Sequence, residues 1–180
     1  MTTGLLLELT RRHQELHRHY HSLGHIAAML DAGRTFPLDD AQTMAVWFHD
    51  AIYDPRSATN EEDSAALAGE RLRAAGWAAR DVDLVQRIVL DTKRHVPSCP
   101  EAEPVLDLDL MSLAVPWPEF ARNTEAIRRE YAHVADADFA AGRKAFFAAM
   151  LQRDRLYFTP FGKALEVAAR ANLARALGGG

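Results

Sequence analysis

The stretch AVWFHDAIYD, residues 45–54, places His49 and Asp50 side by side within a run of aromatic and aliphatic residues. On a helix from Asp39 to Ile52, His49 lies beside the apolar side that faces the core, and Asp50 lies on the opposite side. The two side chains can bind one ion only if the ion sits at the flank of this helix and neighbouring helices close around it. We therefore expect further ligands from distant parts of the sequence.

The rest of the chain predicts an all-α fold, because helical periodicity recurs throughout and alternating runs rich in Val, Ile and Thr are absent. One helix is expected in HSLGHIAAMLDAG, ended by Gly33, and the next from around Asp39 through His49. Another is expected in ATNEEDSAALAGERLRAAG, with Asn60 as N-cap and Gly76 as terminator. Further helices are predicted at about residues 80–94, 105–115, 117–134, 136–153 and 161–177. We expect one compact bundle of about seven to eight helices, a single domain over residues 1–180 with its core at about 17–175.

Composition narrows the class of protein. The chain has 180 residues, 48% of them hydrophobic and 26% charged, which is typical of a globular domain. A net charge of −4 disfavours a protein built to coat nucleic acid. The single cysteine, Cys99, excludes an intramolecular disulfide and a cysteine-rich zinc site, and fits a reducing cytoplasm. MTTGLLLELTRRH is unlike a secretory signal and no apolar stretch approaches the roughly 20 residues of a membrane span, so we expect a cytoplasmic protein without a membrane partner.

Histidines and aspartates elsewhere offer the remaining ligands. His21 and His25 are four residues apart, hence on one helical face, and they precede His49 by one predicted helix. Downstream, PVLDLDLMSLA carries Asp107 and Asp109, which project to different sides of a helix, so one ion cannot take both. The projection puts Asp109 inside an apolar arc and Asp107 at its edge. A carboxylate in a core is costly unless it is paired or binds a metal, which favours Asp109 as the ligand.

These motifs resemble a known superfamily. A histidine, a later His-Asp pair and an aspartate in an Asp-x-Asp-Leu context are similar to the metal-binding residues of the HD superfamily of metal-dependent phosphohydrolases. The segments RHYHSLGHIAAML, WFHDAIYD, NEEDSA, DTKRHVP, DLDLMSL, IRREY and GRKAFF resemble a compact family of uncharacterised predicted HD phosphohydrolases. The resemblance covers about residues 17–175 and implies an all-α fold that holds a divalent metal by His25, His49, Asp50 and Asp109.

The chemistry of this ligand set suits hydrolysis. Imidazoles and carboxylates that leave coordination positions open to solvent suit divalent Mn, Fe, Ni, Co, Zn or Mg. Such an ion activates water and stabilises negative charge on a phosphoryl oxygen, and Asp50 could both bind it and orient the attacking water. We expect hydrolysis of a phosphoester or phosphoanhydride bond in a small phosphorylated molecule, with nucleotides among the candidates. Alternatives are a non-catalytic nucleotide-sensing module, a di-iron oxygenase with His95 as extra ligand, and a purely structural helical domain.

Other polar residues in the resembling segments are candidates for catalysis and substrate contact. In DTKRHVP, His95 is a catalytic candidate, while Lys93 and Arg94 could contact phosphate or merely complement the end of a helix. Glu61 is a candidate general acid or base and Glu62 could support the centre. Both glutamates are equally well explained as acidic residues in a first helical turn.

Arg128 and Arg143 are the remaining substrate candidates, because arginines bind phosphate in a bidentate manner. Ordinary surface ion pairs are the alternative for both arginines. We expect His21 and Asp107 to support the metal ligands by hydrogen bonds.

Overall fold

The computed structural model describes residues 2–36 and 38–178, and over these ranges the chain is helical without a β-strand. The all-α prediction is confirmed. The chain divides into two compact units, Met1–Leu106 and Asp107–Gly180, and the boundary falls inside helix α6 (Glu103–Leu110). The single-domain prediction stays a prediction. No helix in the described part of the chain is both long and apolar enough to cross a membrane.

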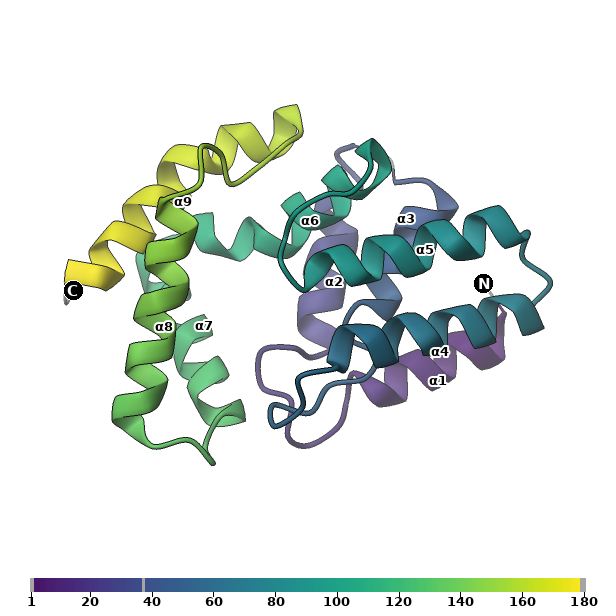
Figure 1. Cartoon of the computed structure of the whole chain (residues 1–180), viewed down its shortest axis with the longest axis horizontal. Coiled ribbons are helices and arrows are strands. Elements are labelled where there is room, and N and C mark those ends of the chain that lie inside the picture. Colours follow the sequence, from purple (N-terminus) through teal and green to yellow (C-terminus); the bar gives the residue numbers. More distant parts are fainter. Residues whose placement is uncertain (1, 37, 179–180) are drawn as a thin grey trace. The chain divides into compact units, whose positions relative to one another are not determined.

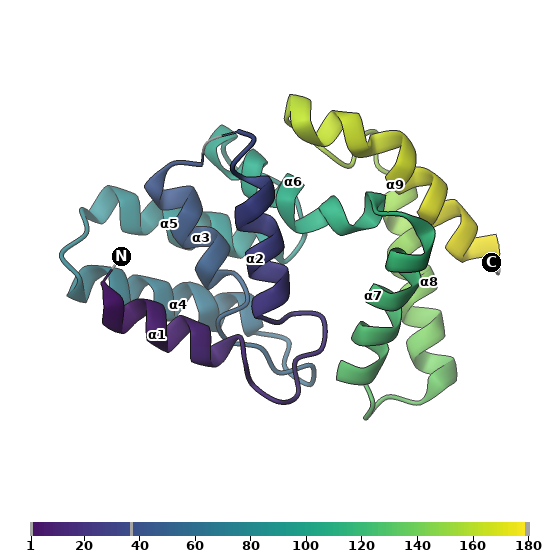
Figure 2. The same ribbon diagram turned by 180° about the vertical axis from the view of Figure 1, so that it is seen from behind.

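Five helices and a short 3-10 turn precede α6 in the first unit: α1 (Thr3–Arg12), α2 (Leu23–Ala32), α3 (Asp40–Phe48), α4 (Asn60–Ala74), α5 (Ala79–Thr92) and η1 (Pro100–Ala102). Helices α4 and α5 lie side by side, and α3 packs against α5 (Figures 1 and 2). Ile26, Phe48, Leu72 and Ile88, one from each of α2 to α5, are fully buried. Each such side chain contributes roughly 1.5–3 kcal/mol of hydrophobic stabilisation, so this core fixes the helices that carry His25 and His49.

The second unit contains the end of α6, η2 (Met111–Ala114), α7 (Trp117–Glu130), α8 (Asp136–Leu151) and α9 (Pro160–Gly178). Helix α9 packs against α8 and η2. The core of the second unit includes Leu113, Phe120, Phe147, Met150, Tyr157 and Leu173. The buried Tyr157 hydroxyl donates to the carbonyl of Leu110 at 2.9 Å, so this tyrosine is hydrogen-bonded as well as packed.

Helix α1 was not predicted. Thr2 caps it by accepting from the Leu5 amide at 3.3 Å, and Leu5 and Leu9 bury its apolar side. Arg71 on α4 donates to Glu8 at 2.9 Å, and this hydrogen bond lowers the pKa of the Glu8 carboxyl. The N-terminal segment is therefore tied to the first unit by both packing and an ion pair.

Helix α3 ends close to the predicted end at His49 but short of Ile52, to which the projection extended it. Asp39 caps the start of the helix in a reciprocal capping box with Gln42, and this agrees with the predicted start. The last helical residue is Phe48, and His49 is the C-cap. The projection, which extended the helix to Ile52 and placed Asp50 opposite the core, is wrong. Because Asp50 follows the helix, its side chain is no longer constrained to the far face.

The other helix ends lie close to the predicted ones. Gly33 is the C-cap of α2, and Gly76 follows α4 with a positive φ of 81°, which glycine adopts without steric cost. The N-cap of α4 is Thr59, one residue before the predicted Asn60. The Asn60 side chain instead accepts from the amide of Asp54 and donates to its carbonyl, both at 2.9 Å, so it ties down the preceding loop.

Candidate metal centre

His49 sits at the C-cap of α3 with only 2% of its surface exposed. Its Nδ1–H donates to the carbonyl of Val46 at 2.9 Å, and because a carbonyl only accepts, this nitrogen carries the proton. Nε2 lies 3.1 Å from Oδ2 of Asp50. Two ligand atoms at right angles around one ion, each about 2.1 Å from it, are about 3 Å apart, so this separation fits neighbouring ligands of one metal.

His25 and Asp109 complete a compact group with His49. The rings of His25 and His49 are 5.4 Å apart, and His25 on α2 is 9% exposed. One ligand atom from each of His25, His49 and Asp109 lies within 4.8 Å of the others, and these three could hold a metal ion. Asp109 is on α6 and is half-buried.

Asp107 has a different environment from the one predicted. It is fully buried, whereas Asp109 is only half-buried, so the predicted order of burial is wrong. Its carboxylate accepts from the amides of Phe158 and Thr159 at 2.9 and 2.7 Å, and from the Thr159 hydroxyl at 2.6 Å. These bonds anchor the start of α9, and the nearby Gly162 has no side chain to block them. A supporting role of Asp107 at the metal stays a prediction.

The loop between α1 and α2, residues 13–22, supplies three side chains that bind carbonyls around the His-Asp pair. His13 donates to Trp47 at 2.9 Å, His17 donates to Tyr53 at 2.8 Å, and Arg18 donates to Asp50 at 2.7 Å and Ala51 at 3.3 Å. These carbonyls follow or end α3, where a helix leaves its last carbonyls without intrahelical donors. We call the three donors the carbonyl cradle.

Sequence reasoning missed the carbonyl cradle. The signal was the basic character of RRHQELHRHYHSLGH, in which only His21 and His25 were singled out as part of the site. Burial lowers the pKa of His13 to about 4, which keeps this imidazole neutral. Which carbonyls these side chains meet depends on the packed structure.

His21 lies in an aromatic cluster beside His25. Its ring stacks on Tyr53 at 4.4 Å and meets the rings of Tyr20 and His25 edge-on at 4.9 and 6.4 Å. Tyr20 is also in ring contact with His25 at 5.2 Å. These contacts pack the side of the His25 ring, which limits its rotation.

Glu61, Glu62 and Lys93 are brought together at the start of α4 and the end of α5. Lys93 donates to Glu62 at 2.6 Å and to the carbonyl of Ala58 at 2.7 Å, and lies 3.6 Å from Glu61. The hydrogen bond with Lys93 lowers the pKa of Glu62, and the same bond raises the pKa of Lys93. The ammonium of Lys93 forms exposed ion pairs with Glu61 and Glu62. The predicted contact of Lys93 with phosphate stays a prediction.

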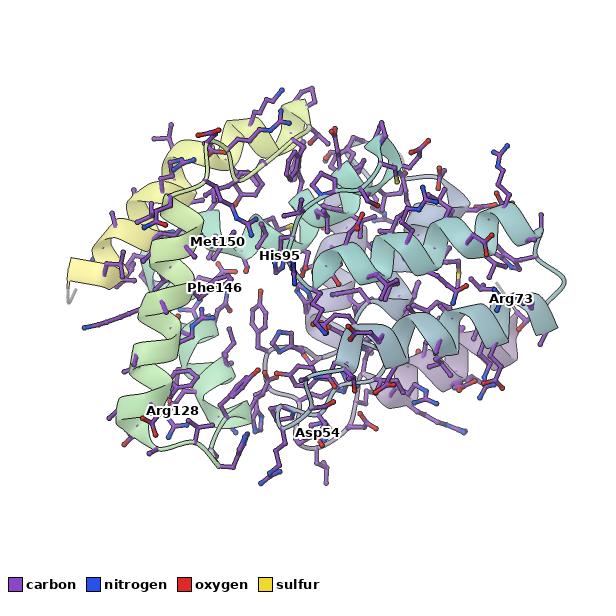
Figure 3. All side chains as sticks on the ribbon, in the orientation of Figure 1. Asp54, Arg73, His95, Arg128, Phe146 and Met150 are labelled. Carbon is purple, nitrogen blue, oxygen red and sulfur yellow. The ribbon has the colours of Figure 1, made fainter. Side chains whose placement is uncertain are left out.

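His95 lies in the loop after α5, in a left-handed backbone conformation with φ of 49° (Figure 3). This conformation is uncommon for residues other than glycine, although histidine adopts it more often than most, and residues in such conformations cluster at functional sites. His95 is half-buried and Arg94 beside it is exposed. His95 is not a member of the group that could hold a metal, and the catalytic and substrate roles of both residues stay predictions.

Arg128 holds the loop between α7 and α8 (Figure 3). It donates to Asp136 at 2.6 Å and to the carbonyls of Tyr131 and Val134 at 2.6 and 2.9 Å. These contacts favour a structural role over the predicted contact with substrate.

Arg143 on α8 lies over the rings of Phe146 and Phe147, at 5.2 and 4.5 Å. An arginine stacked on two rings gains cation–π stabilisation. The predicted phosphate contact of Arg143 is untested.

The donor set fits a divalent ion. The two imidazoles and the Asp109 carboxylate are borderline and hard ligands, which suit Mn, Fe, Co, Ni or Zn better than a soft metal. Asp50 lies beside His49 but is not a member of this group, so its predicted ligation stays a prediction. The Nδ1–H bond of His49 is the kind of contact that orients a ligating imidazole and raises its basicity. Comparisons of the chain with protein-family models, curated proteins and solved structures find no match.

Proposed function

We propose that this chain is a metal-dependent phosphohydrolase that acts on a small phosphorylated molecule. The observation that carries the proposal is the position of His49 Nε2, 3.1 Å from the Asp50 carboxylate. With its proton on Nδ1, an imidazole can bind a cation through Nε2, and the Asp50 carboxylate beside it can bind the same cation. A divalent ion attracts both groups, which supports the proposal.

The ligand groups support hydrolysis as the chemistry of this ion. When bound, a divalent ion supplies Lewis acidity toward water and toward a phosphoryl oxygen. In the proposal, Asp50 accepts a proton from water at the centre, and its exposure of 16%, against 2% for His49, supports this role. A carboxylate that is partly open to solvent can both ligate and orient water, whereas the buried imidazole is confined to ligation.

Glu61 and His95 are the proposed proton-transfer groups for the leaving group. Glu61 lies in the first turn of α4 with 29% of its side chain exposed and Lys93 at 3.6 Å. His95 has a positive φ of 49°, and non-glycine residues in this conformation are often found at functional sites. In the proposal, one of these two groups protonates the departing oxygen.

The test compares Asp50→Asn with Asp54→Asn after reconstitution with Mn²⁺. Asp54 is an exposed carboxylate in the same loop, so it controls for the loss of one negative charge (Figure 3). Metal content and hydrolysis of phosphomonoester, phosphodiester and nucleoside polyphosphate substrates are measured for all three proteins. We expect metal-dependent hydrolysis in wild type and Asp54→Asn, and a loss of at least about a hundredfold in Asp50→Asn.

Two results would overturn the proposal. One is a wild-type protein that binds no divalent metal after reconstitution. The other is hydrolysis by Asp50→Asn at the wild-type rate, because the carboxylate would then have no part in the reaction.

A further inference from the structure

We propose that Arg18 is a positioning residue for the metal centre, a role that rests on the proposed function. Its guanidinium joins the backbone of the His-Asp pair to the turn that leads into α2, the helix of His25. Arg18 acts on the geometry of the ligands, because its hydrogen bonds reach backbone carbonyls and Glu15 rather than ligand side chains.

The guanidinium of Arg18 makes four hydrogen bonds with its side chain fully buried. One terminal nitrogen donates to the carbonyls of Asp50 at 2.7 Å and His21 at 3.1 Å. The other donates to the carbonyl of Ala51 at 3.3 Å, and Nε donates to Glu15 at 2.9 Å. The side chain therefore bridges two segments that are far apart in the sequence.

The packing around Arg18 explains why a buried cation is tolerated. The Tyr53 ring lies 5.3 Å from the guanidinium carbon, a cation–π contact that gains strength where water is excluded. His17 and His21 both stack on the same Tyr53 ring. A planar fork suits this site because it donates from three separate nitrogens in fixed directions, whereas a lysine donates from a single nitrogen.

The position of the Asp50 carboxylate depends on this contact. Asp50 follows the end of α3, so helical hydrogen bonding does not hold its backbone, and the donation from Arg18 to its carbonyl takes that place. A ligand must be held within about 0.5 Å of its productive position for full affinity. Loss of groups that orient ligands typically costs about 10- to 100-fold in metal affinity.

Cobalt(II) binding tests the inference, because visible absorption reports on both affinity and ligand geometry. Arg18→Lys is compared with Arg170→Lys in the second unit. Arg170 also donates to two carbonyls, those of Leu151 and Arg153, and to the carboxylate of Glu166. We expect Arg18→Lys to weaken Co²⁺ binding at least about tenfold and to change the spectrum, while Arg170→Lys lowers only thermal stability.

The outcomes separate the inference from the proposed function. If wild type binds no Co²⁺, both fail. If wild type binds Co²⁺ and folded Arg18→Lys matches it in affinity and spectrum, only the role of Arg18 is overturned. If Arg18→Lys does not fold, Glu15→Ala replaces it, because it removes the acceptor that orients the guanidinium from a side chain that is 44% exposed. Weaker Co²⁺ binding by Glu15→Ala supports the inference, and unchanged binding overturns it.

Discussion

Replacement of His13 by glutamine should remove a specific part of the pH dependence of stability. His13 has no exposed surface, and its Nε2–H donates to the carbonyl of Trp47 at 2.9 Å. A glutamine amide can make the same donation but does not titrate in this range. The substitution therefore tests the imidazole as a titrating group while it keeps the hydrogen bond.

The size of the effect follows from the two pKa values of His13. Burial lowers its pKa from 6.5 to about 4 in the folded chain. Between these values the unfolded chain binds the proton and the folded chain does not, so stability is full above pH 6.5 and falls as the pH drops toward 4. Each pH unit costs up to about 1.4 kcal/mol, which gives a loss of about 2 kcal/mol between pH 7.5 and pH 5.0.

Urea unfolding of the metal-free protein at these two pH values measures the loss. Trp47 lies beside His13, with ring centroids 6.3 Å apart, so its fluorescence reports on this part of the first unit once Trp77 and Trp117 are replaced by phenylalanine. His133→Gln, at an exposed position in the second unit, controls for the removal of an imidazole. The reasoning is refuted if His13→Gln loses as much free energy of unfolding as the parent between pH 7.5 and 5.0.

Three further perturbations give results that the structure predicts. Gly162→Ala places a Cβ 2.6 Å from Cβ of Tyr157 and should lower the free energy of unfolding by about 1–3 kcal/mol, whereas Gly142→Ala, with nothing within 4 Å on α8, should raise it by up to about 1 kcal/mol. Denaturation followed by circular dichroism distinguishes these results, and equal effects would contradict the close contact. Asp107→Asn should cost about 2 kcal/mol in the same assay, because an amide nitrogen replaces one acceptor of the amides at the start of α9; a neutral result would show that these bonds add little. Mn²⁺ at a hundred times its Kd for the wild-type protein should raise the free energy of unfolding of that protein by about 2.7 kcal/mol. An increase of the same size in His25→Ala at the same Mn²⁺ concentration would exclude this residue as a ligand.

Local signals in the sequence predicted most helices. The capping box at Asp39 and the glycines at 33 and 76 act within one or two turns, so a single sequence contains the information. The projection to Ile52 went past the end of α3, because the apolar pattern continues to Ile52. What ends the helix is tertiary: the carbonyl cradle supplies donors to the carbonyls beyond Phe48, which a continued helix would satisfy internally.

The candidate site was predicted in part. His25, His49 and Asp109 were chosen from the sequence, and the structure brings their ligand atoms together. Asp109 was nevertheless selected for the wrong reason, because Asp107 is the more buried of the two. Amides about fifty residues later in the sequence donate to the Asp107 carboxylate and lower the free-energy cost of burying it. Arg18 was overlooked for a related reason: its role depends on carbonyls more than thirty residues away.

The carbonyl cradle also bears on how this chain can diverge. Most loops accept insertions and deletions because their length is not tied to a fixed set of partners. Here His13, His17 and Arg18 each meet a backbone oxygen of residues 47–53, so one added residue between them would move at least one donor out of register. Length variation should therefore be strongly disfavoured in residues 13–18, a constraint usually associated with secondary structure and here imposed on an irregular segment.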